Sequence, residues 1–430
     1  MTDRPKAGGS LFAPLRHRDF RLLWLGMSVS LLGDGAYLVA LAWQAYALSP
    51  NPQALAVLGI CATVPQLLAL LGGGILSDRV QRRRILLIAD AVRFVAVAVV
   101  AVLVLVGEVR MWHLVAVSIV YGLGAGVAAP AFDAIVPDLV PDGDLEQANA
   151  LEQFLRPGML RLAGPALGGL LIAALGVGWG LALNALSFLI SAGCLVLMRH
   201  PAKAPTHPPM SDSQSLLSDV RAGARYVISH VWLWGTFASA AVAYLMFIGP
   251  TEVLLPYIVR ETLHGTAADF GIILAAGGVG ALAAAVILGA VGLPRRQLSF
   301  MYVSWCLATL AVAGYGLAQA GWQLMVICML INGLEAAGTV AWATTKQRLI
   351  PGELLGRVSS LDWFISIAGL PLSYALTAPI AALIGVRATL ISAGLIGAGC
   401  TLAALFLPGM RKVDGALTTR PAVAVEYQPV

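Results

Sequence analysis

The sequence is built from apolar runs that are each long enough to cross a lipid bilayer. A membrane-spanning helix needs about 20 predominantly apolar residues. Twelve such runs cover residues 20–47, 53–77, 85–107, 111–136, 149–176, 178–198, 232–257, 268–292, 298–318, 322–345, 358–384 and 388–407. Only 11% of the 430 residues are charged, against roughly 25% in an ordinary globular domain. The pattern predicts an all-α integral membrane protein with twelve transmembrane helices.

A polar stretch separates the runs into two groups. We predict an N-terminal half over residues 1–198, a cytoplasmic linker with an amphipathic segment over 199–231, a C-terminal half over 232–408 and a cytoplasmic tail over 409–430. A weak internal repeat supports two equivalent halves, because the fourth run ends in Leu-Val-Pro-Asp-Gly and the tenth in Leu-Ile-Pro-Gly-Glu. Repeats of this kind place a binding site near the bilayer midplane, between the halves.

The distribution of lysine and arginine predicts the orientation. Cytoplasmic loops carry an excess of both residues, and one side of the predicted bundle holds the basic N-terminus, the arginine-rich loop 79–84, the linker and the tail. The opposite side holds only Arg110, Arg260 and Arg387. We therefore expect a multi-pass protein of the bacterial inner membrane with both termini in the cytoplasm. Topology accounts for the net charge of +5, so no nucleic-acid partner is expected.

The cysteines and histidines indicate neither a metal nor a cofactor. All five cysteines lie inside apolar runs, without the spacing of metal ligands, and are expected to be buried thiols. The sequence also lacks the motifs of a metalloprotease, a serine hydrolase or a nucleotide-binding P-loop. We therefore expect no enzymatic activity and no cofactor.

The loop after the second run carries a signature motif. Residues 74–84 read Gly-Ile-Leu-Ser-Asp-Arg-Val-Gln-Arg-Arg-Arg, which resembles the G-x-L-x-D-R-x-G-R-R loop of the major facilitator superfamily, with Gln81 in place of a glycine. The resemblance implies the major facilitator fold, with two pseudo-symmetric six-helix halves, and a cytoplasmic gate at this loop. Acidic residues at the end of the fourth helix are expected to face its arginines. The predicted gate residues are Gly74, Asp78, Arg79, Arg82, Arg83, Asp133 and Asp138.

The fifth run carries a second motif, formed by Gly164, Pro165, Gly168 and Gly169. Small residues allow close helix packing, and proline permits a bend. The segment is similar to the G-P-x-x-G-G core of the antiporter branches, although Leu160 stands where that family has a further glycine. Together with patterns at residues 20–34 and 130–141, it resembles the exporter branch that includes macrolide efflux proteins and the enterobactin exporter. This branch implies outward transport of a small molecule by a monomer in the lipid bilayer, driven by exchange for protons.

Charged residues inside the runs are the best candidates for a functional site, because a charge at the bilayer centre costs about 2.5 to 3.5 kcal/mol on insertion scales. Asp34 lies halfway along the first run. Burial favours a protonated carboxyl group, so Asp34 is the leading candidate to bind the coupled proton. The alternative is a permanent ion pair, most plausibly with Arg161, which lies at a comparable depth in the fifth run.

The second half offers two further acids for proton coupling, Glu252 and Glu335. Glu335 is the stronger candidate, because it lies on one helical face with other polar residues and a tryptophan, as suits a cavity wall. Glu252 lies near the extracellular end, where a solvated rim position is about as plausible. The predicted substrate-binding residues are Tyr37, Asn332, Thr339, Trp342, Tyr244 and Trp363.

A third internal charge pair has a simpler interpretation. Asp90 and Arg93 are three residues apart and are expected to pair with each other near the cytoplasmic surface. The fourth run differs from that of other drug antiporters, because Ser118 occupies the position at which they often carry an arginine, four residues before Gly122. Any proton relay must therefore use other groups.

The most plausible function is secondary active export of small amphiphilic, drug-like molecules in exchange for protons. A siderophore or a lipid-like metabolite is an alternative cargo. Uptake by proton symport is a less favoured alternative, since only the likeness of the glycine motif argues for antiport. A channel fits less well with two repeated halves and a gate loop.

Overall fold

The computed structural model describes residues 12–141, 144–199, 221, 223–411 and 413–414, with the side chains at 71–79, 146, 150, 153, 352 and 353 outside the description. The described backbone is helical throughout its ordered elements, and twelve of its segments are long and apolar enough to span a membrane. Each of the twelve predicted runs overlaps one of these segments. The predicted all-α fold with twelve membrane-spanning segments is therefore confirmed.

The helices of the first half follow one another with short connections. Their bounds are η1 Ala13–Arg16, α1 Arg18–Leu48, α2 Pro52–Arg79, α3 Arg82–Leu105, α4 Met111–Leu139, α5 Leu145–Arg156, η3 Pro157–Ala163, α6 Gly164–Leu175 and α7 Val177–Leu197. The second half also has six described spans, but its π-helical segments lie in the first of them. Its bounds are α9 Val231–Gly249, η4 Pro250–Leu254, α10 Leu255–Tyr257, η5 Ile258–Thr262, α11 Ala267–Val291, α12 Gln297–Leu317, α13 Gly321–Leu349, α14 Gly352–Ala368, α15 Leu370–Ile384 and α16 Val386–Ala404.

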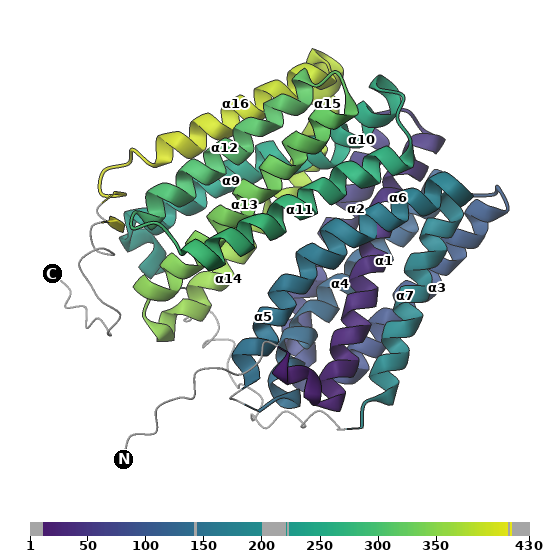
Figure 1. Cartoon of the computed structure of the whole chain (residues 1–430), viewed down its shortest axis with the longest axis horizontal. Coiled ribbons are helices and arrows are strands. Elements are labelled where there is room, and N and C mark those ends of the chain that lie inside the picture. The colour runs from purple at the N-terminus through teal and green to yellow at the C-terminus, as the bar shows by residue number, and fades with distance from the viewer. Residues whose placement is uncertain (1–11, 142–143, 200–220, 222, 412, 415–430) are drawn as a thin grey trace.

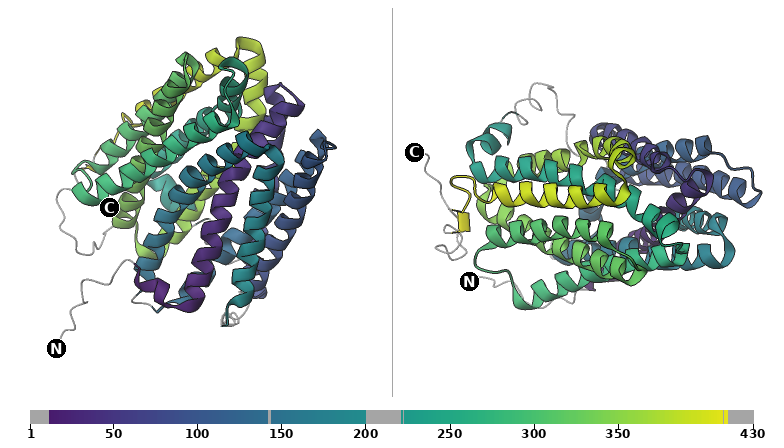
Figure 2. Two further views of the ribbon diagram at one scale, coloured as in Figure 1. Left: turned by 45° about the vertical axis from the view of Figure 1, so that its right-hand side comes forward. Right: turned by 90° about the horizontal axis from the view of Figure 1, so that it is seen from above.

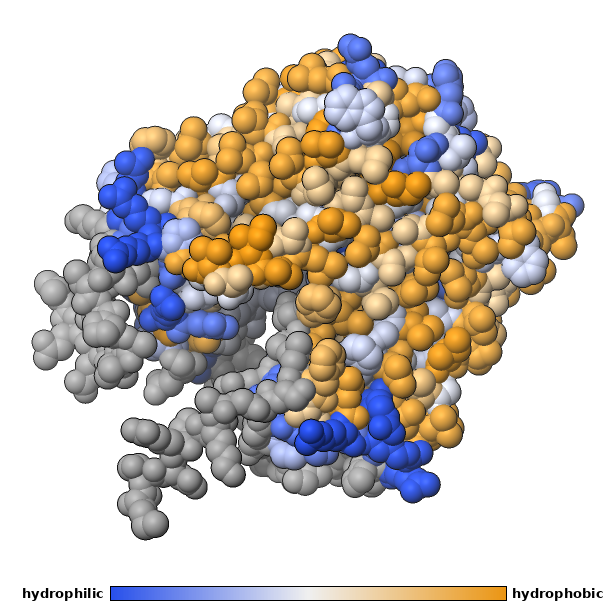
Figure 3. All heavy atoms as spheres, viewed as in Figure 1, coloured by the Kyte–Doolittle hydropathy of each residue, from blue (hydrophilic) through white to orange (hydrophobic). Residues whose placement is uncertain are grey.

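The surface has the pattern of a protein embedded in lipid. On the face shown in Figure 3, hydrophobic side chains cover the middle of the molecule, and hydrophilic ones gather toward the ends of the helices. Large apolar side chains such as Val291 and Leu383 are more than 80% exposed. Such exposure is stable in hydrocarbon, because the hydrophobic penalty applies only in water.

The two groups of helices, α1–α7 and α9–α16, pack against each other at one end and diverge at the other (Figure 1). The views in Figure 2 show the same separation of the purple-to-teal helices from the green-to-yellow ones. We define the closed end as the end at which α1 finishes at Leu48 and α11 begins at Ala267. The open end is the opposite one, at which α1 begins at Arg18 and α13 finishes at Leu349.

Hydrogen bonds hold the halves together at the closed end. The hydroxyl of Tyr46 on α1 donates to the carbonyl oxygen of Val253 on η4 at 2.6 Å. Arg260 on η5 donates from Nη1 to the carbonyl oxygen of Trp43 at 2.7 Å, and its guanidinium carbon lies 5.2 Å from the centroid of the Trp43 ring. Both contacts join α1 to the broken helix after α9.

The glycine motif of α6 lies between α1 and α11. A Cβ atom added at Gly164 would lie 2.8 Å from Gly35 Cα, and one added at Gly168 would lie 2.7 Å from Ala36 Cβ, both on α1. A Cβ atom added at Gly169 would lie 2.9 Å from Gly271 Cα on α11. The motif therefore permits close approach on two sides of one helix, within the first half and across to the second.

Three segments have π-helical rather than α-helical hydrogen bonding. They are η3, η4 and η5. The first two interrupt the runs 149–176 and 232–257, which the sequence predicts as continuous helices, and η5 directly follows the second run. A π-helical turn contains an extra residue, so it changes the direction in which later side chains point. This change matters for Arg161 and Glu252, which lie on η3 and η4.

Candidate functional site

Asp34 lies at a cavity of about 220 Å³ inside the first half. Helices α1, α2, α3, α4, α5 and α7 contribute to its wall. The polar side chains of the wall are Ser30, Asp34, Gln66, Asp90, Arg93, Arg156 and Ser191. The Oδ1 atom of Asp34 is buried and has no hydrogen-bond partner among the described residues. A buried, unsatisfied carboxylate oxygen is costly, and protonation of the group removes much of that cost.

Two tyrosines pack beside Asp34. The rings of Tyr37 on α1 and Tyr121 on α4 are stacked, with centroids 4.4 Å apart and an interplanar angle of 4°. The hydroxyl of Tyr121 lies next to the Asp34 carboxyl group. Tyr37, which the sequence suggested as a substrate-binding residue, is only 3% exposed and belongs to the buried core.

Asp90 and Arg93 form an ion pair in the wall of the same cavity. Arg93 Nη2 lies 2.6 Å from Asp90 Oδ1, and the two side chains are 9% and 6% exposed. The predicted pairing is therefore confirmed, but the predicted position near the surface is wrong, because Arg93 lies midway along α3 and both side chains are buried. The spacing of two residues within one helix predicts their contact but not the helices that cover them.

Arg161 connects the two halves between their ends. Its Nη1 atom donates to Asn332 Oδ1 on α13 at 2.8 Å and lies 3.6 Å from Glu335 Oε2. Thr339 donates to Glu335 Oε1 at 3.3 Å. The alternative of a permanent pair between Asp34 and Arg161 is wrong for this conformation. A regular α-helix would place Arg161 at the depth of Asp34. Arg161 instead lies on the π-helical turn η3, which directs it toward α13.

The surroundings of Arg161 are open. Its side chain is 50% exposed and that of Glu335 is 30% exposed, although both lie on spans rather than in loops. This exposure places them at the space where the halves diverge. Tyr244 on α9 lies near Glu335 and Asp362.

Glu252 lies on η4, closer to the closed end. The hydroxyl of Tyr374 on α15 donates a hydrogen bond to Glu252 Oε2. The ring of Tyr374 also packs against α2, because a Cβ atom added at Gly59 would lie 2.8 Å from it. Glu252 therefore joins η4 to α15, and the same tyrosine of α15 contacts α2.

The second half contains a partly buried ion pair, which the sequence pattern does not predict. Lys346 Nζ lies 2.5 Å from Asp362 Oδ2, with side chains 13% and 15% exposed. The same oxygen accepts a 2.8 Å hydrogen bond from Trp342 Nε1. Trp342 is only 5% exposed, packed among other aromatic rings, while Trp363 is 67% exposed. Both were suggested as substrate-binding residues. Lys346 and Asp362 lie on different helices, so no helical spacing in the sequence indicates that they pair.

The predicted gate residues lie at the open end. The side chains of Gly74, Asp78 and Arg79 lie outside the description, and the backbone of α2 reaches Arg79. Arg82 forms a 2.7 Å ion pair with Asp138 and donates to the carbonyl oxygen of Ala134 at 2.8 Å. Asp133 is exposed near Glu152 and Arg156.

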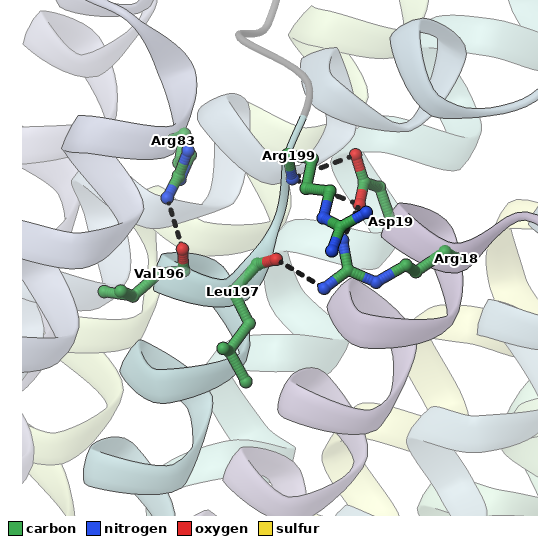
Figure 4. Close-up of polar contacts among 6 residues, drawn as sticks. All are labelled: Arg18, Asp19, Arg83, Val196, Leu197 and Arg199. Atoms are coloured by element: carbon green, nitrogen blue, oxygen red, sulfur yellow. Dashed lines mark hydrogen bonds and ion pairs between the residues drawn. The ribbon is translucent and has the colours of Figure 1, made fainter.

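Arginines also cap the end of α7 (Figure 4). Arg83 donates to the carbonyl oxygen of Val196 at 2.7 Å, and Arg18 donates to that of Leu197 at 3.1 Å. Asp19 accepts from the backbone N–H of Arg199 at 3.2 Å. Cationic side chains at a helix C-terminus satisfy its last carbonyl groups and its partial negative charge. Within the part of the chain that the structure describes, these contacts of Arg82 and Arg83 stay inside the first half.

The described residues form twelve apolar spans in two groups, and an ion pair joins the groups. This is the architecture of a membrane transporter with the major facilitator fold. A family model described as a transmembrane secretion effector matches residues 9–426. The chain therefore belongs to this family of major facilitator transporters, and it is an efflux transporter rather than an enzyme.

Two relatives are similar over nearly their whole length. Macrolide efflux protein A of Streptococcus pyogenes is 23% identical over 398 residues, which cover 92% of this chain and 97% of that protein. The enterobactin exporter EntS of Citrobacter koseri is 26% identical over 392 residues, which cover 91% of each chain.

Solved structures show the same fold at lower identity. A bacterial homologue of the human lysosomal transporter Spinster, in an inward-facing and unoccupied conformation, has a TM-score of 0.69 at 13% identity, covering 96% of this chain and 100% of that one. A D-xylose–proton symporter has a TM-score of 0.66 at 16% identity, covering 94% and 99%. These likenesses establish the architecture of the chain and leave its cargo open.

Proposed function

We propose that the protein exports small amphiphilic, drug-like molecules from the cell in exchange for protons, by alternating access in the bacterial inner membrane and as a monomer. The carboxyl group of Asp34 carries the proposal, because its Oδ1 atom is buried without a partner among the described residues, in a cavity inside the first half. A group that is costly to bury charged and that reaches a cavity suits reversible proton binding.

The proposed cargo site is the space around Arg161 and Glu335, where the halves diverge. The partly exposed guanidinium and carboxylate groups supply polar contacts, and Tyr244 lies beside them. The exposed ring of Trp363 on α14 is a further candidate. Mostly apolar walls with a few polar groups are typical of sites for amphiphilic ligands. A siderophore or a lipid-like metabolite remains the alternative cargo, and export of enterobactin by a relative supports testing the former.

The proposed orientation places the open end and both termini in the cytoplasm. The basic loop between α2 and α3 lies at the open end, and positive charge is retained on the cytoplasmic side. In this orientation the structure is inward-open, and the arginine contacts at the open end belong to the cytoplasmic gate.

The decisive experiment measures transport in inside-out vesicles that contain the full-length protein. A macrolide and a catecholate siderophore are tested as separate probes while the vesicle lumen is acidified. We expect accumulation of one probe, abolished by a protonophore and lost in Asp34→Asn. Glu108→Gln is the matched control, because Glu108 is exposed in the loop between α3 and α4 and its loss should leave the rate unchanged.

The sign of coupling separates antiport from symport. An acidic lumen drives the cargo of an antiporter into inside-out vesicles and the cargo of a symporter out of them. Proton-driven accumulation at the wild-type rate in Asp34→Asn would overturn the role of Asp34. Efflux of the probe from the acidified lumen would overturn the proposed direction.

A further inference from the structure

Arg93 occupies an unusual position for a charged residue, midway along a span and wholly inside one half. Its Nη2 atom donates to Asp90 at 2.6 Å, and its Nε atom donates to the carbonyl oxygen of Ala89 at 3.3 Å. Its guanidinium carbon lies 4.3 Å from the centroid of the Phe188 ring on α7. A buried ion pair is weak evidence for stability, since desolvation offsets much of its attraction. A mid-membrane pair is therefore a candidate for a functional role.

The path of the Arg93 side chain depends on a glycine of α4. A Cβ atom added at Gly124 would lie 2.8 Å from Arg93 Cγ and 2.9 Å from Arg93 Cδ. The side chain thus lies across α4 where that helix has no side chain of its own. One turn and a half earlier on α4, Ser118 is fully buried and donates to the carbonyl oxygen of Leu114. The buried cation in the described cavity wall, Arg93, is therefore supplied by α3.

The charged and titratable groups that act on Asp34 come from every neighbouring side. They are Arg93 and Asp90 on α3, Tyr121 on α4, Arg156 on α5 and Tyr37 on its own helix. Among these, Arg156 is 47% exposed and already paired with Glu152 at 3.2 Å. Arg93 is the buried cation of the set, and its charge is balanced by Asp90 in the present conformation.

We infer that Arg93 is the counter-ion of the Asp34 carboxylate. While Asp34 is protonated, Arg93 pairs with Asp90 instead. This inference rests on the proposed function, because it takes Asp34 as the proton carrier. When the O–H bond of Asp34 breaks, the proton passes to water in the cavity, and the guanidinium group turns from Asp90 toward the new carboxylate. No other covalent bond changes. Arg93 and Asp90 are thus positioning residues that link the protonation of α1 to the packing of α3 against α4 and α7.

The inference predicts opposite effects for the two members of the pair. In Asp90→Asn the guanidinium is free to stabilise the Asp34 carboxylate, so deprotonation moves to lower pH. In Arg93→Gln that stabilisation is lost, so deprotonation moves to higher pH. An opposite charge at close range changes a carboxyl titration by one to three pH units, and we expect a change of about one unit in each direction. Glu152→Gln is the control, because it frees the exposed Arg156, whose charge is screened by water.

The measurement needs no knowledge of the cargo. Purified full-length protein is titrated with pH, and infrared difference spectroscopy follows the carbonyl stretching band of protonated carboxyl groups. The part of the carbonyl band that disappears in Asp34→Asn belongs to Asp34. If no contribution disappears, the role of Asp34 in the proposed function fails. If the Asp34 band titrates equally in wild type, Asp90→Asn and Arg93→Gln, the inference about Arg93 fails while the proposed function stands.

A second variant moves Arg93 without changing any charge. Gly124→Ala places a methyl group against the arginine stem, whereas Gly193→Ala on α7 adds one that meets nothing within 4 Å. We expect Gly124→Ala to move the Asp34 titration toward higher pH, as Arg93→Gln does, and Gly193→Ala to leave it unchanged. This comparison remains available if the charge variants fail to fold. An unchanged titration in Gly124→Ala would overturn the inference.

Discussion

The substitution Gly169→Ala tests whether the contact between α6 and α11 controls the closed end. The added Cβ atom would lie 2.6 Å from the carbonyl oxygen of Ala267 and 2.9 Å from Gly271 Cα. The first distance is about 0.8 Å shorter than the 3.4 Å at which ordinary contact begins. Both neighbours are backbone atoms, so relief requires the two helices to separate rather than a side chain to rotate.

The expected cost follows from packing energetics. Forcing a methyl group into a well-packed contact costs typically 1 to 3 kcal/mol. Because the contact exists only while the closed end is closed, the whole cost falls on that conformation. A coupling of this size corresponds to a population shift of about 5- to 150-fold toward the conformation open at this end. A protein that is mostly closed there would become a mixture of both conformations.

Distance measurements between spin labels give the populations directly. Labels on cysteines introduced at Ser49 and His264, in a background without native cysteines, report the separation of the halves at the closed end. We expect a longer distance to gain population in Gly169→Ala. Gly158→Ala is the matched control, since its added Cβ atom meets nothing within 4 Å. Identical distance distributions in Gly169→Ala and wild type, or an equal change in the control, would refute the reasoning.

Three further predictions test other contacts and the orientation. Tyr46→Phe removes the hydrogen bond to the carbonyl oxygen of Val253, worth about 0.5 to 1.5 kcal/mol, so the same labels should show a shift of at most about tenfold toward the open distance. Asp362→Asn leaves the partly buried Lys346 charge unpaired and should lower the free energy of unfolding by about 1 to 3 kcal/mol, measured by thermal unfolding in detergent. Replacing Lys346 by methionine in the same variant should restore most of this loss. A cysteine in place of Glu108 should react with a membrane-impermeant maleimide in intact cells, and reaction only after lysis would reverse the proposed orientation.

The sequence allowed the spans to be predicted because each depends on local composition alone. Runs such as 85–107 and 388–407 coincide closely with α3 and α16, since the length of apolar chain needed to cross a bilayer is fixed. The π-helical segments could not be predicted in the same way. Pro157 and Pro250 begin two of them, but proline is compatible with a regular first helical turn as well as with a bend.

In the candidate site, contacts within one helix could be predicted from the sequence, whereas contacts between helices could not. The spacing of Asp90 and Arg93 predicted their ion pair, since residues three apart share a helical face. Their burial depends on Phe188 and Gly124, which lie on helices distant in sequence. The contact of Arg161 with α13 was missed for a similar reason. One extra residue in a helical turn changes which neighbour a side chain contacts. Amino-acid composition does not reveal where such a π-helical turn occurs.

Each half keeps one buried or partly buried ion pair to itself, and this arrangement limits what alternating access must change. Asp90 and Arg93 lie within α3, and Lys346 and Asp362 join α13 to α14. Since both partners belong to the same half, a rigid-body rotation of one half against the other leaves each pair intact. The desolvation cost of the Lys346–Asp362 pair then cancels from the conformational equilibrium, whereas the Asp90–Arg93 pair changes only with the protonation of Asp34 that we infer.

The contacts that do change are those between the halves. Arg161 with Glu335 lies where both side chains are partly exposed, so water can replace each partner when the halves move. At the closed end, Tyr46 and Arg260 donate hydrogen bonds between the halves, beside the packing of α6 against α11. Because a few weak contacts of this kind separate the conformations, a small coupling energy suffices to shift their populations. In the proposed function, protonation of one buried carboxyl group, that of Asp34, would supply a coupling energy of that size.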